Sequence, residues 1–343
     1  MNNKQDNLLP GKIPGELLHN LLNKINISDP RVEIGAKIGE DAALLDFGDK
    51  YLAITTDPIT FATDLLGWYL VNINANDIAV TGAKPKWLTT TLLFPTHTKS
   101  KEISKIFDDI VDACKNIDVT IIGGHTEITD SISKPIAIGT MLGEVKKKEA
   151  VLTSGAKPGD TIILTKGIGI EGTSILCRDL DRVLIDNGVS IITINAGKNY
   201  LFEPGISVIK DVSTILNTAK VHSMHDLTEG GLSTGLIEMA TASNVGVVVN
   251  SDDLIISPIT LACCEATSIN PLGLLSSGAL IATLNPSDVN NVIAALSKEN
   301  IISKNIGYVT EKESGISLNS KKGTVEFPRF NRDELARCFD LFN

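Results

Sequence analysis

The chain has 343 residues, which is too long for one ordinary hydrophobic core, so we expect two domains. Hydrophobic residues make up 43% and charged residues 21%, as in ordinary globular proteins, and the formal net charge is −10. This charge argues against nucleic acid or an anionic membrane as the main partner, although Mg²⁺ held by carboxylates can still bridge to a phosphate ligand.

The cysteines and the first residues bear on the compartment. The five cysteines form no Cys-x-x-Cys pair and are odd in number, so neither a disulfide framework nor a structural zinc site is expected. Residues 1–6 contain no apolar signal core, and no apolar run reaches membrane-spanning length. We therefore expect a cytoplasmic protein.

The first half reads as a mixture of strands and helices. A glycine-flanked loop ends in the adjacent acids Glu40 and Asp41, and a strand pair follows it. The strand expected at 119–122 is wholly apolar, which predicts burial on both faces. In order, we expect a helix at 15–25, strands at 42–46 and 51–56, a helix at 63–82, a strand at 87–94, a helix at 99–116, and strands at 119–122 and 136–143.

The helix expected at 63–82 has clear signals at both ends. Thr63 or Asp64 can cap its first backbone N–H groups. Gly82 suits a left-handed stop, and Pro85 prevents the helix from continuing.

Three polar residues on this helix stand out against its apolar composition. Asn72 and Asn76 lie four residues apart on one face, with Asp77 beside them. Because unpaired buried polar groups are costly, these side chains need partners. Either the asparagines bond to neighbouring backbone, or Asn76 and Asp77 face a metal-bound ligand; the helix alone does not decide.

The composition turns polar around residues 146–158, and we place a domain boundary there, giving domains 1–150 and 151–343. The second half alternates the two kinds of element. We expect strands at 161–165, 221–224, 245–250, 279–284, 306–310 and 316–318, and helices at 179–187, 207–218, 229–243, 261–267 and 287–299.

Four acid-bearing turns of the first half suggest a metal site. Strand ends of an α/β core commonly converge on one crevice, and hard carboxylate oxygens suit Mg²⁺. Asp is also a frequent turn former, so one such turn is a weak signal, but four in one domain favour a magnesium site. The turns are Gly39-Glu-Asp41, Thr55-Thr-Asp57, Asn76-Asp77 and Gly123-Gly-His-Thr-Glu127.

Other motifs add to this site or exclude alternatives. The backbone N–H groups of Gly123 and Gly124 can approach a phosphate closely. The glycine-rich stretch 166–172 does not have dinucleotide-binding spacing, and no Walker-type loop occurs. His225 precedes a helix start, where it could transfer a proton or bond a phosphate, whereas Asp226 or Thr228 could simply cap that helix.

These residues together resemble the aminoimidazole ribonucleotide synthetase (PurM-like) superfamily over almost the whole chain. The pattern is most similar to its hydrogenase expression/formation branch. The matching segments, in family order, are Gly39-Glu-Asp-Ala-Ala43, Thr55-Thr-Asp-Pro58, Asn74-Ala-Asn-Asp-Ile-Ala79, Gly82-Ala-Lys-Pro85, Gly123-Gly-His-Thr-Glu127 and His225-Asp-Leu-Thr-Glu-Gly-Gly-Leu232.

Several positions depart from that branch. The chain ends Arg337-Cys-Phe-Asp-Leu-Phe-Asn343 and lacks the carboxy-terminal Pro-Arg-Ile-Cys tail, so Cys338 does not occupy the terminal thiol position. Glu127 stands where the branch has an active-site lysine, and Ser276-Ser-Gly278 replaces its Asn-Glu-Gly turn. The resemblance therefore implies a paralogue that kept the ATP site and changed the second substrate.

The resemblance implies an α+β, two-domain fold in which the amino-terminal mixed sheet forms a barrel across a homodimer and the carboxy-terminal domain is α/β. ATP and Mg²⁺ would lie in the cleft between the domains. Asp41 and Asp77 would hold the metal, and His225 and Glu229 would serve as acid or base. The residues expected at the nucleotide or its phosphates are Asp57, Asn76, Gly123, Gly124, Thr126, Glu127 and Asp226.

We therefore expect an ATP- and Mg²⁺-dependent enzyme that phosphorylates or activates an oxygen of a small substrate. An alternative is an adaptor that binds ATP without chemistry and docks to a partner protein during maturation. A third is a phosphatase or kinase on an unrelated metal-dependent fold.

Overall fold

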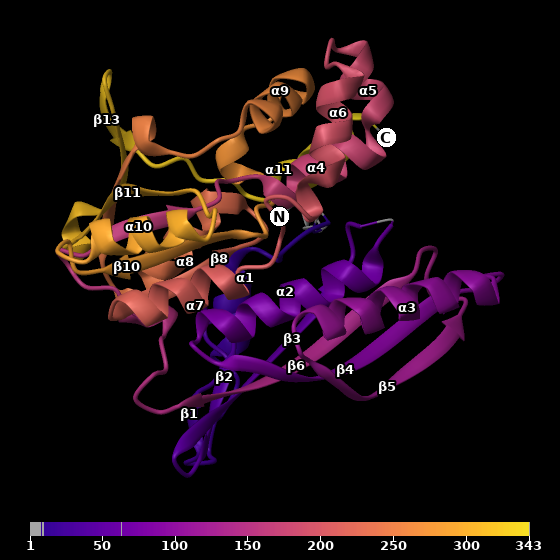
Figure 1. The fold of residues 1–343 in the computed structure, drawn as a ribbon, viewed down its shortest axis with the longest axis horizontal. Helices are drawn as coiled ribbons and strands as arrows, with labels where there is room; N and C mark the ends of the chain where they lie inside the picture. The colour runs from indigo at the N-terminus through magenta and orange to yellow at the C-terminus, as the bar shows by residue number, and fades with distance from the viewer. Residues whose placement is uncertain (1–7, 9, 63, 343) are drawn as a thin grey trace, which may run out of the picture.

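Two β-sheets, one in each half of the chain, organise the protein (Figure 1). This is a computed structural model, and it describes residues 8, 10–62 and 64–342. Both sheets combine parallel and antiparallel pairs and carry helices, so the predicted α+β class is confirmed.

The first sheet has six strands in the order β1-β2-β3-β6-β4-β5. Neighbours are antiparallel except β4 and β5, which run parallel. In the central pair, Asp57 of β3 lies opposite Gly139 of β6. The strands are β1 (Val32–Ile34), β2 (Ala43–Phe47), β3 (Lys50–Ile59), β4 (Lys84–Pro95), β5 (Thr120–Thr129) and β6 (Ile136–Lys146).

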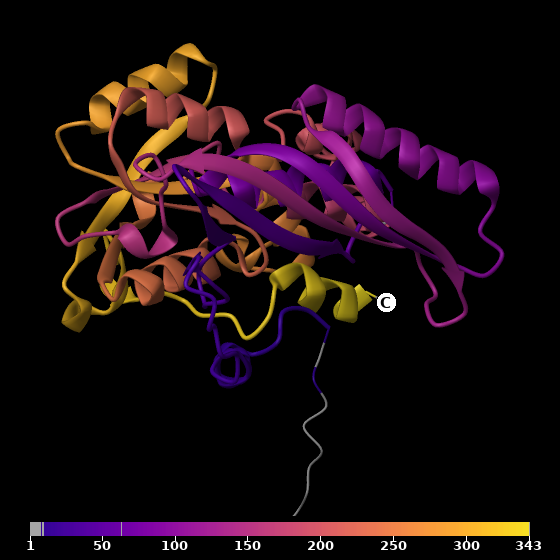
Figure 2. The same cartoon turned by 90° about the horizontal axis from the view of Figure 1, so that it is seen from below.

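Helices α2 (Leu66–Val80) and α3 (Ser100–Asn116) pack side by side over one face of this sheet (Figures 1 and 2). The expected stop of α2 is confirmed, because Gly82 has a left-handed φ of 78°. The expected cap is not made: Asp64 pairs with Arg178 instead, and Thr63 lies outside the described residues. No described helix covers the opposite face of the sheet (Figure 2).

Strand β5 differs most from expectation. The strand predicted at 119–122 continues straight through Gly123–Glu127 to Thr129, and most of its residues are exposed. The prediction of burial on both faces was wrong because β5 is an edge strand, paired only with β4 among the described residues. An added Cβ at Gly124 would lie 2.3 Å from the Thr90 backbone oxygen, so close strand approach accounts for this glycine.

The second sheet has seven strands in the order β13-β12-β9-β11-β7-β10-β8. They are β7 (Thr161–Thr165), β8 (Val221–Leu227), β9 (Gly246–Asn250), β10 (Ala279–Leu284), β11 (Ser303–Thr310), β12 (Ile316–Ser320) and β13 (Gly323–Glu326). One face packs against α7 (Ile209–Thr218) and α10 (Val289–Lys298). The other packs against α8 (Gly231–Ser243).

A group of helices joins the two halves. Their apolar residues share one continuous core with α2 and the first sheet. The group consists of α4 (Ile170–Asp179), α5 (Asp181–Asp186), α6 (Ile191–Lys198), α9 (Pro258–Thr267) and α11 (Glu334–Phe342). The sequence reading predicted no helix at α6 or α11 and missed α4 up to its last residue. It placed a helix at 179–187, where the structure has the end of α4 followed by α5.

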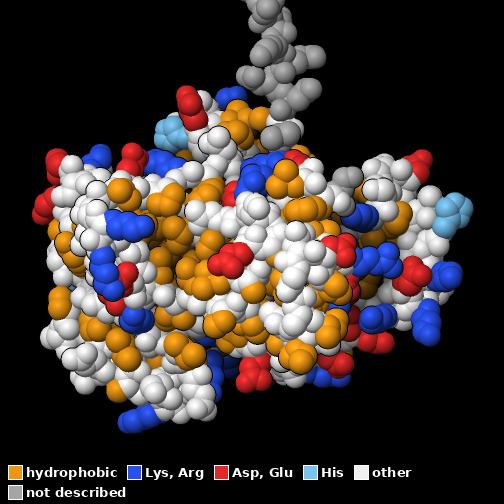
Figure 3. Space-filling model, turned by 90° about the horizontal axis from the view of Figure 1, so that it is seen from above, with side chains coloured by type: hydrophobic (Ala, Val, Ile, Leu, Met, Phe, Trp, Pro, Cys, Tyr) orange, Lys and Arg blue, Asp and Glu red, His pale blue; other side chains and the backbone are white. Residues whose placement is uncertain are grey.

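The remaining elements are short. They are α1 (Gly15–Leu22) and the 3₁₀ turns η1 (Thr153–Gly155), η2 (Asn199–Leu201), η3 (Ser251–Asp253), η4 (Pro271–Gly273) and η5 (Lys312–Ser314). All five cysteines are buried and free. On the face in Figure 3, basic side chains are interspersed with acidic ones. Within the described part of the chain, none of the helices is long and apolar enough to cross a membrane.

Candidate functional site

A cavity of about 660 Å³ opens between the two halves of the chain. Acidic side chains from both halves line it, together with an apolar wall. Its acidic residues are Glu40, Asp41, Asp57, Asp77, Glu171, Asp226 and Glu229, its basic ones Lys12 and His225, and its apolar wall includes Ile59, Phe61, Ala62, Ile73 and Leu275. The acids that the sequence scatters over the chain are therefore neighbours in space.

The first sheet and α2 fix two of these acids. Asp57 lies near the end of β3, where its backbone N–H donates to the Asn74 Oδ1 of α2 at 3.1 Å. Asp77 lies one helical turn beyond Asn74 and accepts a hydrogen bond from the Thr55 hydroxyl at 2.7 Å. These hydrogen bonds between β3 and α2 fix the Asp57 and Asp77 carboxylates beside each other in the cavity wall.

Asp41 enters the cavity from the loop before β2. Gly39 allows this loop to turn, since its φ is 84° and an added Cβ would lie 2.7 Å from the Glu238 backbone oxygen. The neighbouring Glu40 carboxylate accepts the backbone N–H groups of Thr153 and Ser154, both at 3.2 Å, and so ties the loop to the second half.

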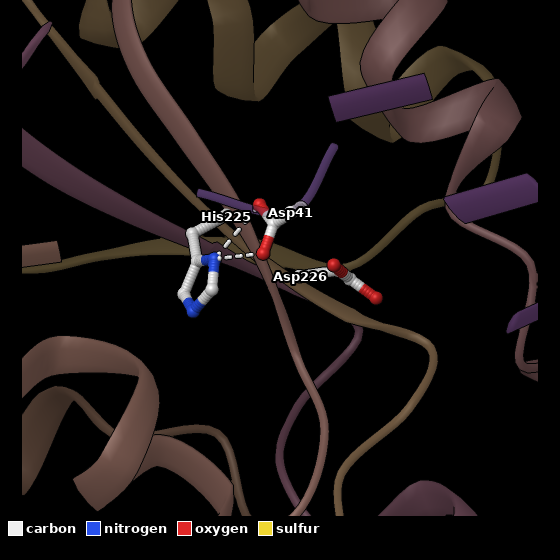
Figure 4. A group of neighbouring side chains, drawn as sticks. All are labelled: Asp41, His225 and Asp226. Atoms are coloured by element: carbon white, nitrogen blue, oxygen red, sulfur yellow. Dashed lines mark hydrogen bonds and ion pairs between the residues drawn. The ribbon is translucent and has the colours of Figure 1, made fainter. Parts of the chain in front are cut away.

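From the second half, β8 supplies His225 and Asp226 (Figure 4). The His225 Nδ1 lies 2.7 Å from Asp41 Oδ1, and its Nε2 lies 3.2 Å from Glu238 Oε2. Potential ligand atoms of Asp41, His225 and Asp226 all lie within 4.8 Å of one another. Glu229 is half-buried in the turn between β8 and α8.

The pKa values reflect the crowding of buried carboxylates. Burial, reinforced by the Asp57 and Asp226 carboxylates, raises the pKa of Asp77 well above its ordinary value. Burial and repulsion from Asp41 raise the pKa of Asp226 from 3.8 to about 8. Burial likewise raises the pKa of Glu171 from 4.5 to about 8. A cation placed among these groups would favour their ionised forms.

His225 shows the opposite balance. Burial alone would lower its pKa, but attraction to Asp41 and Glu238 outweighs burial and raises the pKa well above 6.5. Both ring nitrogens face carboxylates, so the imidazolium form fits this position. His225 therefore orients Asp41 and leaves no ring nitrogen free to bind a metal.

The carboxylates fit Mg²⁺. The donors are hard oxygens, and the buried Asp226 Oδ2 has no hydrogen-bond partner among the described residues. Asp41, Asp77 and Asp226 are the residues that would hold the ion, with Asp57 beside them.

Several predicted site residues lie elsewhere in this chain. Asn76 points away from the cavity: its Nδ2 donates to Ile206 O, and its Oδ1 accepts from the Val208 N–H, both at 2.8 Å. This bonding to backbone is the alternative that the sequence left open, except that the backbone belongs to the other half of the chain. Asn72 bonds within its own helix, to Trp68 O at 2.8 Å.

The residues predicted from the Gly-Gly motif do not line the cavity either. They are Gly123, Gly124, Thr126 and Glu127, all on β5. Two strands, β6 and β4, separate β5 from β3, which places β5 roughly 14 Å from β3 across the sheet. The motif was read as a turn after a short strand, whereas the backbone continues as an extended edge strand.

The cavity also contains residues that the sequence reading missed. Glu171 was dismissed with the glycine-rich stretch, although it lies in the first turn of α4 and is buried. Ser277 and Lys12 line the cavity, and Glu238 bridges Lys12 to His225. A carboxylate just inside a helix start, in an otherwise apolar segment, was the available signal for Glu171.

Comparisons with known proteins match most of the chain. The family description "AIR synthase related protein" fits twice: its N-terminal domain model matches residues 39–145, and its C-terminal domain model matches residues 157–318. The carbamoyl dehydratase HypE of Rhizobium leguminosarum bv. viciae is 24% identical over 293 residues, covering 83% of this chain and 79% of the relative.

Two further relatives match over most of their length. A hydrogenase expression/formation protein of Methanocaldococcus jannaschii is 29% identical over 322 residues, covering 91% of this chain and 92% of the relative. The thiamine-monophosphate kinase of Buchnera aphidicola is 27% identical over 310 residues, covering 86% of this chain and 91% of the relative.

Solved structures share the fold. The hydrogenase maturation protein HypE in complex with ATP has a TM-score of 0.72 and 21% identity, covering 93% of this chain and 96% of that one. AaThiL complexed with AMPPCP and TMP also scores 0.72, with 20% identity and the same coverage. These likenesses exclude the third expectation, an unrelated metal-dependent fold. With both domain models matched in order, the chain belongs to the AIR synthase related protein family.

Proposed function

We propose that this protein is an ATP- and Mg²⁺-dependent enzyme that phosphorylates, or activates, an oxygen of a small substrate. The observation that carries the proposal is the meeting of Asp41, Asp57 and Asp77 from the first half with Asp226 from the second in one cavity. Carboxylates this close repel one another, and a Mg²⁺–triphosphate supplies the charge that they lack.

In this proposal Asp41, Asp77 and Asp226 hold the metal. Bound Mg²⁺ would neutralise the charge that develops on the phosphates during transfer. His225 keeps Asp41 in place through the 2.7 Å contact and, with both nitrogens occupied, acts as a positioning residue. Glu229, half-buried at the cavity wall, is the residue proposed for acid/base work.

Ligands in structures of similar fold support a nucleotide bound together with the metal. A HypE structure contains ATP, and an AaThiL structure contains AMPPCP and TMP. Relatives also carry out different reactions, as the names carbamoyl dehydratase and thiamine-monophosphate kinase state. We therefore propose a nucleotide and a metal for this chain and take no acceptor substrate from these relatives.

Calorimetric titration with Mg²⁺–ATP tests the proposal. The wild type should bind, and Asp77→Asn should bind at least about tenfold more weakly, because it loses a charged metal ligand. Asp108→Asn, an exposed site on α3, is the matched control and should bind as the wild type does. Equal binding by wild type and Asp77→Asn, or none by the wild type, would remove the proposal.

The adaptor alternative retains one supporting observation. A structure of similar fold is a HypE–HypF complex, with a TM-score of 0.75 and 20% identity. An adaptor would bind Mg²⁺–ATP without releasing phosphate and would retain a partner protein only when nucleotide is present. Phosphate release that Asp77→Asn abolishes would favour the enzyme instead.

A further inference from the structure

One wall of the cavity carries buried polar atoms without partners. Glu171 is 4% exposed and Ser277 is 1% exposed, and both line the cavity. By distance and angle, neither Glu171 Oε2 nor Ser277 Oγ has a hydrogen-bond partner among the described residues, although the Ser277 hydroxyl lies close enough to the Glu171 carboxyl to lower its pKa in part. Buried polar groups are almost always paired, so two unpaired ones side by side in a cavity wall indicate a ligand that completes them.

The backbone around these two residues is fixed. The Gly169 N–H donates to Ser276 Oγ at 2.8 Å, and the Gly172 N–H donates to Leu275 O at 2.9 Å. These bonds tie the start of α4 to the segment that carries Ser277. An added Cβ at Gly172 would lie 2.5 Å from the Leu274 side chain, so there is no room for a larger residue between α4 and the segment 274–277. Glu171 and Ser277 are thus presented in a fixed relation.

The same segment is tied to the turn that carries Glu229. The Ser276 N–H donates to Thr228 O at 3.3 Å. Burial raises the pKa of Glu171 to about 8; the nearby Ser277 hydroxyl lowers this pKa in part, and repulsion from Glu229 and Asp226 raises it further. The wall formed by Glu171 and Ser277 therefore adjoins the proposed metal residues.

The charges of the cavity restrict what can bind there. Seven carboxyl groups line it, against Lys12 and His225, and both of these basic groups already face the Glu238 carboxylate. No described arginine lines it. The carboxylates would repel an anionic group that is not bound to Mg²⁺, whereas they would not repel a neutral or cationic hydrogen-bond donor.

The buried ion pair between Lys166 and Asp211 provides a contrast to Glu171 and Ser277. In a separate cavity of about 500 Å³, Lys166 Nζ donates to Ser207 O at 2.5 Å and Gly205 O at 3.3 Å, and lies 3.3 Å from Asp211 Oδ2. Three acceptors surround the three ammonium protons, so this lysine has a structural role, although the Asp211 Oδ1 beside it has no hydrogen-bond partner among the described residues. Glu171 Oε2 and Ser277 Oγ have no such partners.

We propose that Glu171 and Ser277 form the subsite for the second substrate, and that this subsite takes a neutral or cationic group bearing N–H or O–H donors. The inference rests on the proposed function, since it assumes that a nucleotide occupies the metal side of the cavity. The Glu171 carboxyl oxygen accepts from the group, and Ser277 Oγ exchanges a second hydrogen bond with it. Both are specificity-determining residues in this assignment.

Ligand-observed NMR on the full chain loaded with Mg²⁺–ADP tests the subsite with three probes of similar size. Ethanolamine is cationic, ethylene glycol is neutral and glycolate is anionic. Ethanolamine and ethylene glycol should bind at least about tenfold more tightly than glycolate. Glu171→Gln should weaken ethanolamine about tenfold, and Ser277→Ala should weaken ethanolamine and ethylene glycol together. Glu265→Gln, an exposed site on α9, is the matched control and should change nothing.

Three results would overturn the subsite: glycolate binding as tightly as ethanolamine, no binding by any probe, or unchanged binding in both Glu171→Gln and Ser277→Ala. If Mg²⁺–ADP binds normally in those cases, only the subsite fails. If the wild type does not bind Mg²⁺–ADP, the proposed function fails with it. Thermal unfolding of each variant confirms that it is folded before the comparison is made.

Discussion

Glu171 and Asp226 are carboxyl groups that the fold keeps away from water without giving either a basic partner of its own. Burial is the main cause of the raised pKa in each case, and both values reach about 8. At neutral pH a large share of both groups therefore carries a proton when no metal is bound. Buried carboxyl groups with strongly raised pKa values are common at ligand-binding sites.

This arrangement predicts how stability changes with pH in the metal-free protein. The folded Glu171 keeps its proton up to about pH 8, whereas the unfolded residue releases it near 4.5. Its stabilising contribution is complete below pH 4.5 and is lost as the pH rises towards 8. In EDTA, the wild-type free energy of unfolding should therefore fall across this window relative to Glu171→Gln, by at most about 1.4 kcal/mol per pH unit.

Urea unfolding of wild type and Glu171→Gln at several pH values measures this difference. Parallel pH profiles for the two proteins would contradict the raised pKa of Glu171. Isosteric replacement keeps the side chain's volume, so a change in slope reports the proton and not a cavity.

Some of the cavity residues could be predicted from the sequence, and others could not. Asp41, Asp57, Asp77 and Asp226 were predictable because each lies in or next to a turn or a polar interruption of an apolar element, and the structure places all four at the cavity. Glu171 was not, because its environment depends on the packing of α4 against the segment 274–277, which no local pattern shows.

Helix α2 links the first half of the chain to the second next to the cavity. It carries Asp77 into the cavity on one side, and on the other its Asn76 amide bonds both Ile206 O and the Val208 N–H of the second half. The position of Asp77 relative to the second half is therefore fixed through α2, whereas Asp41 is held by the Glu40 bonds to Thr153 and Ser154. A shift of α2 would move Asp77 relative to Asp226.

Asn76→Ala should destabilise the protein by about 1–3 kcal/mol, because it leaves a buried N–H and a buried C=O unpaired. Asn72→Ala, on the same face of α2, is the matched control. It removes one bond within the helix, to Trp68 O, and should cost about 1 kcal/mol or less. Equal unfolding midpoints for the two variants in urea would contradict the joining role of Asn76.

Strand β5 shows where element prediction failed. A run of apolar residues predicts a doubly buried strand only if both neighbouring strands and both faces are covered. Here β5 forms the sheet edge, and Ile122 and Ile128 are each 55% exposed. Whether an apolar strand lies at the centre or the edge depends on strand order, which local sequence does not encode.

At the scale of the whole molecule, the first sheet has one face without a covering helix and one open edge (Figure 2). Side chains on this face, such as Ile138 and Leu142 of β6, are only half-buried. Open apolar sheet surfaces of this kind are protected in most proteins by association. The barrel across a homodimer, which the family resemblance implies, would cover them and stays a prediction.

Sedimentation velocity checks the dimer. The wild type should sediment as two chains, and Ile138→Lys should shift it towards one chain, because the change places a charge in the contact. Ile192→Lys, at a 79% exposed position on α6, is the matched control and should leave the dimer intact. A monomeric wild type, or a dimer unaffected by Ile138→Lys, would remove this contact.

The central claim is that carboxylates from both halves of the chain hold one metal–triphosphate. Titration of Mn²⁺–ATP followed by electron paramagnetic resonance tests it directly, with Asp77→Asn representing the first half and Asp226→Asn the second. The wild type should bind, and each variant should bind at least about tenfold more weakly. Wild-type affinity in either variant would contradict it.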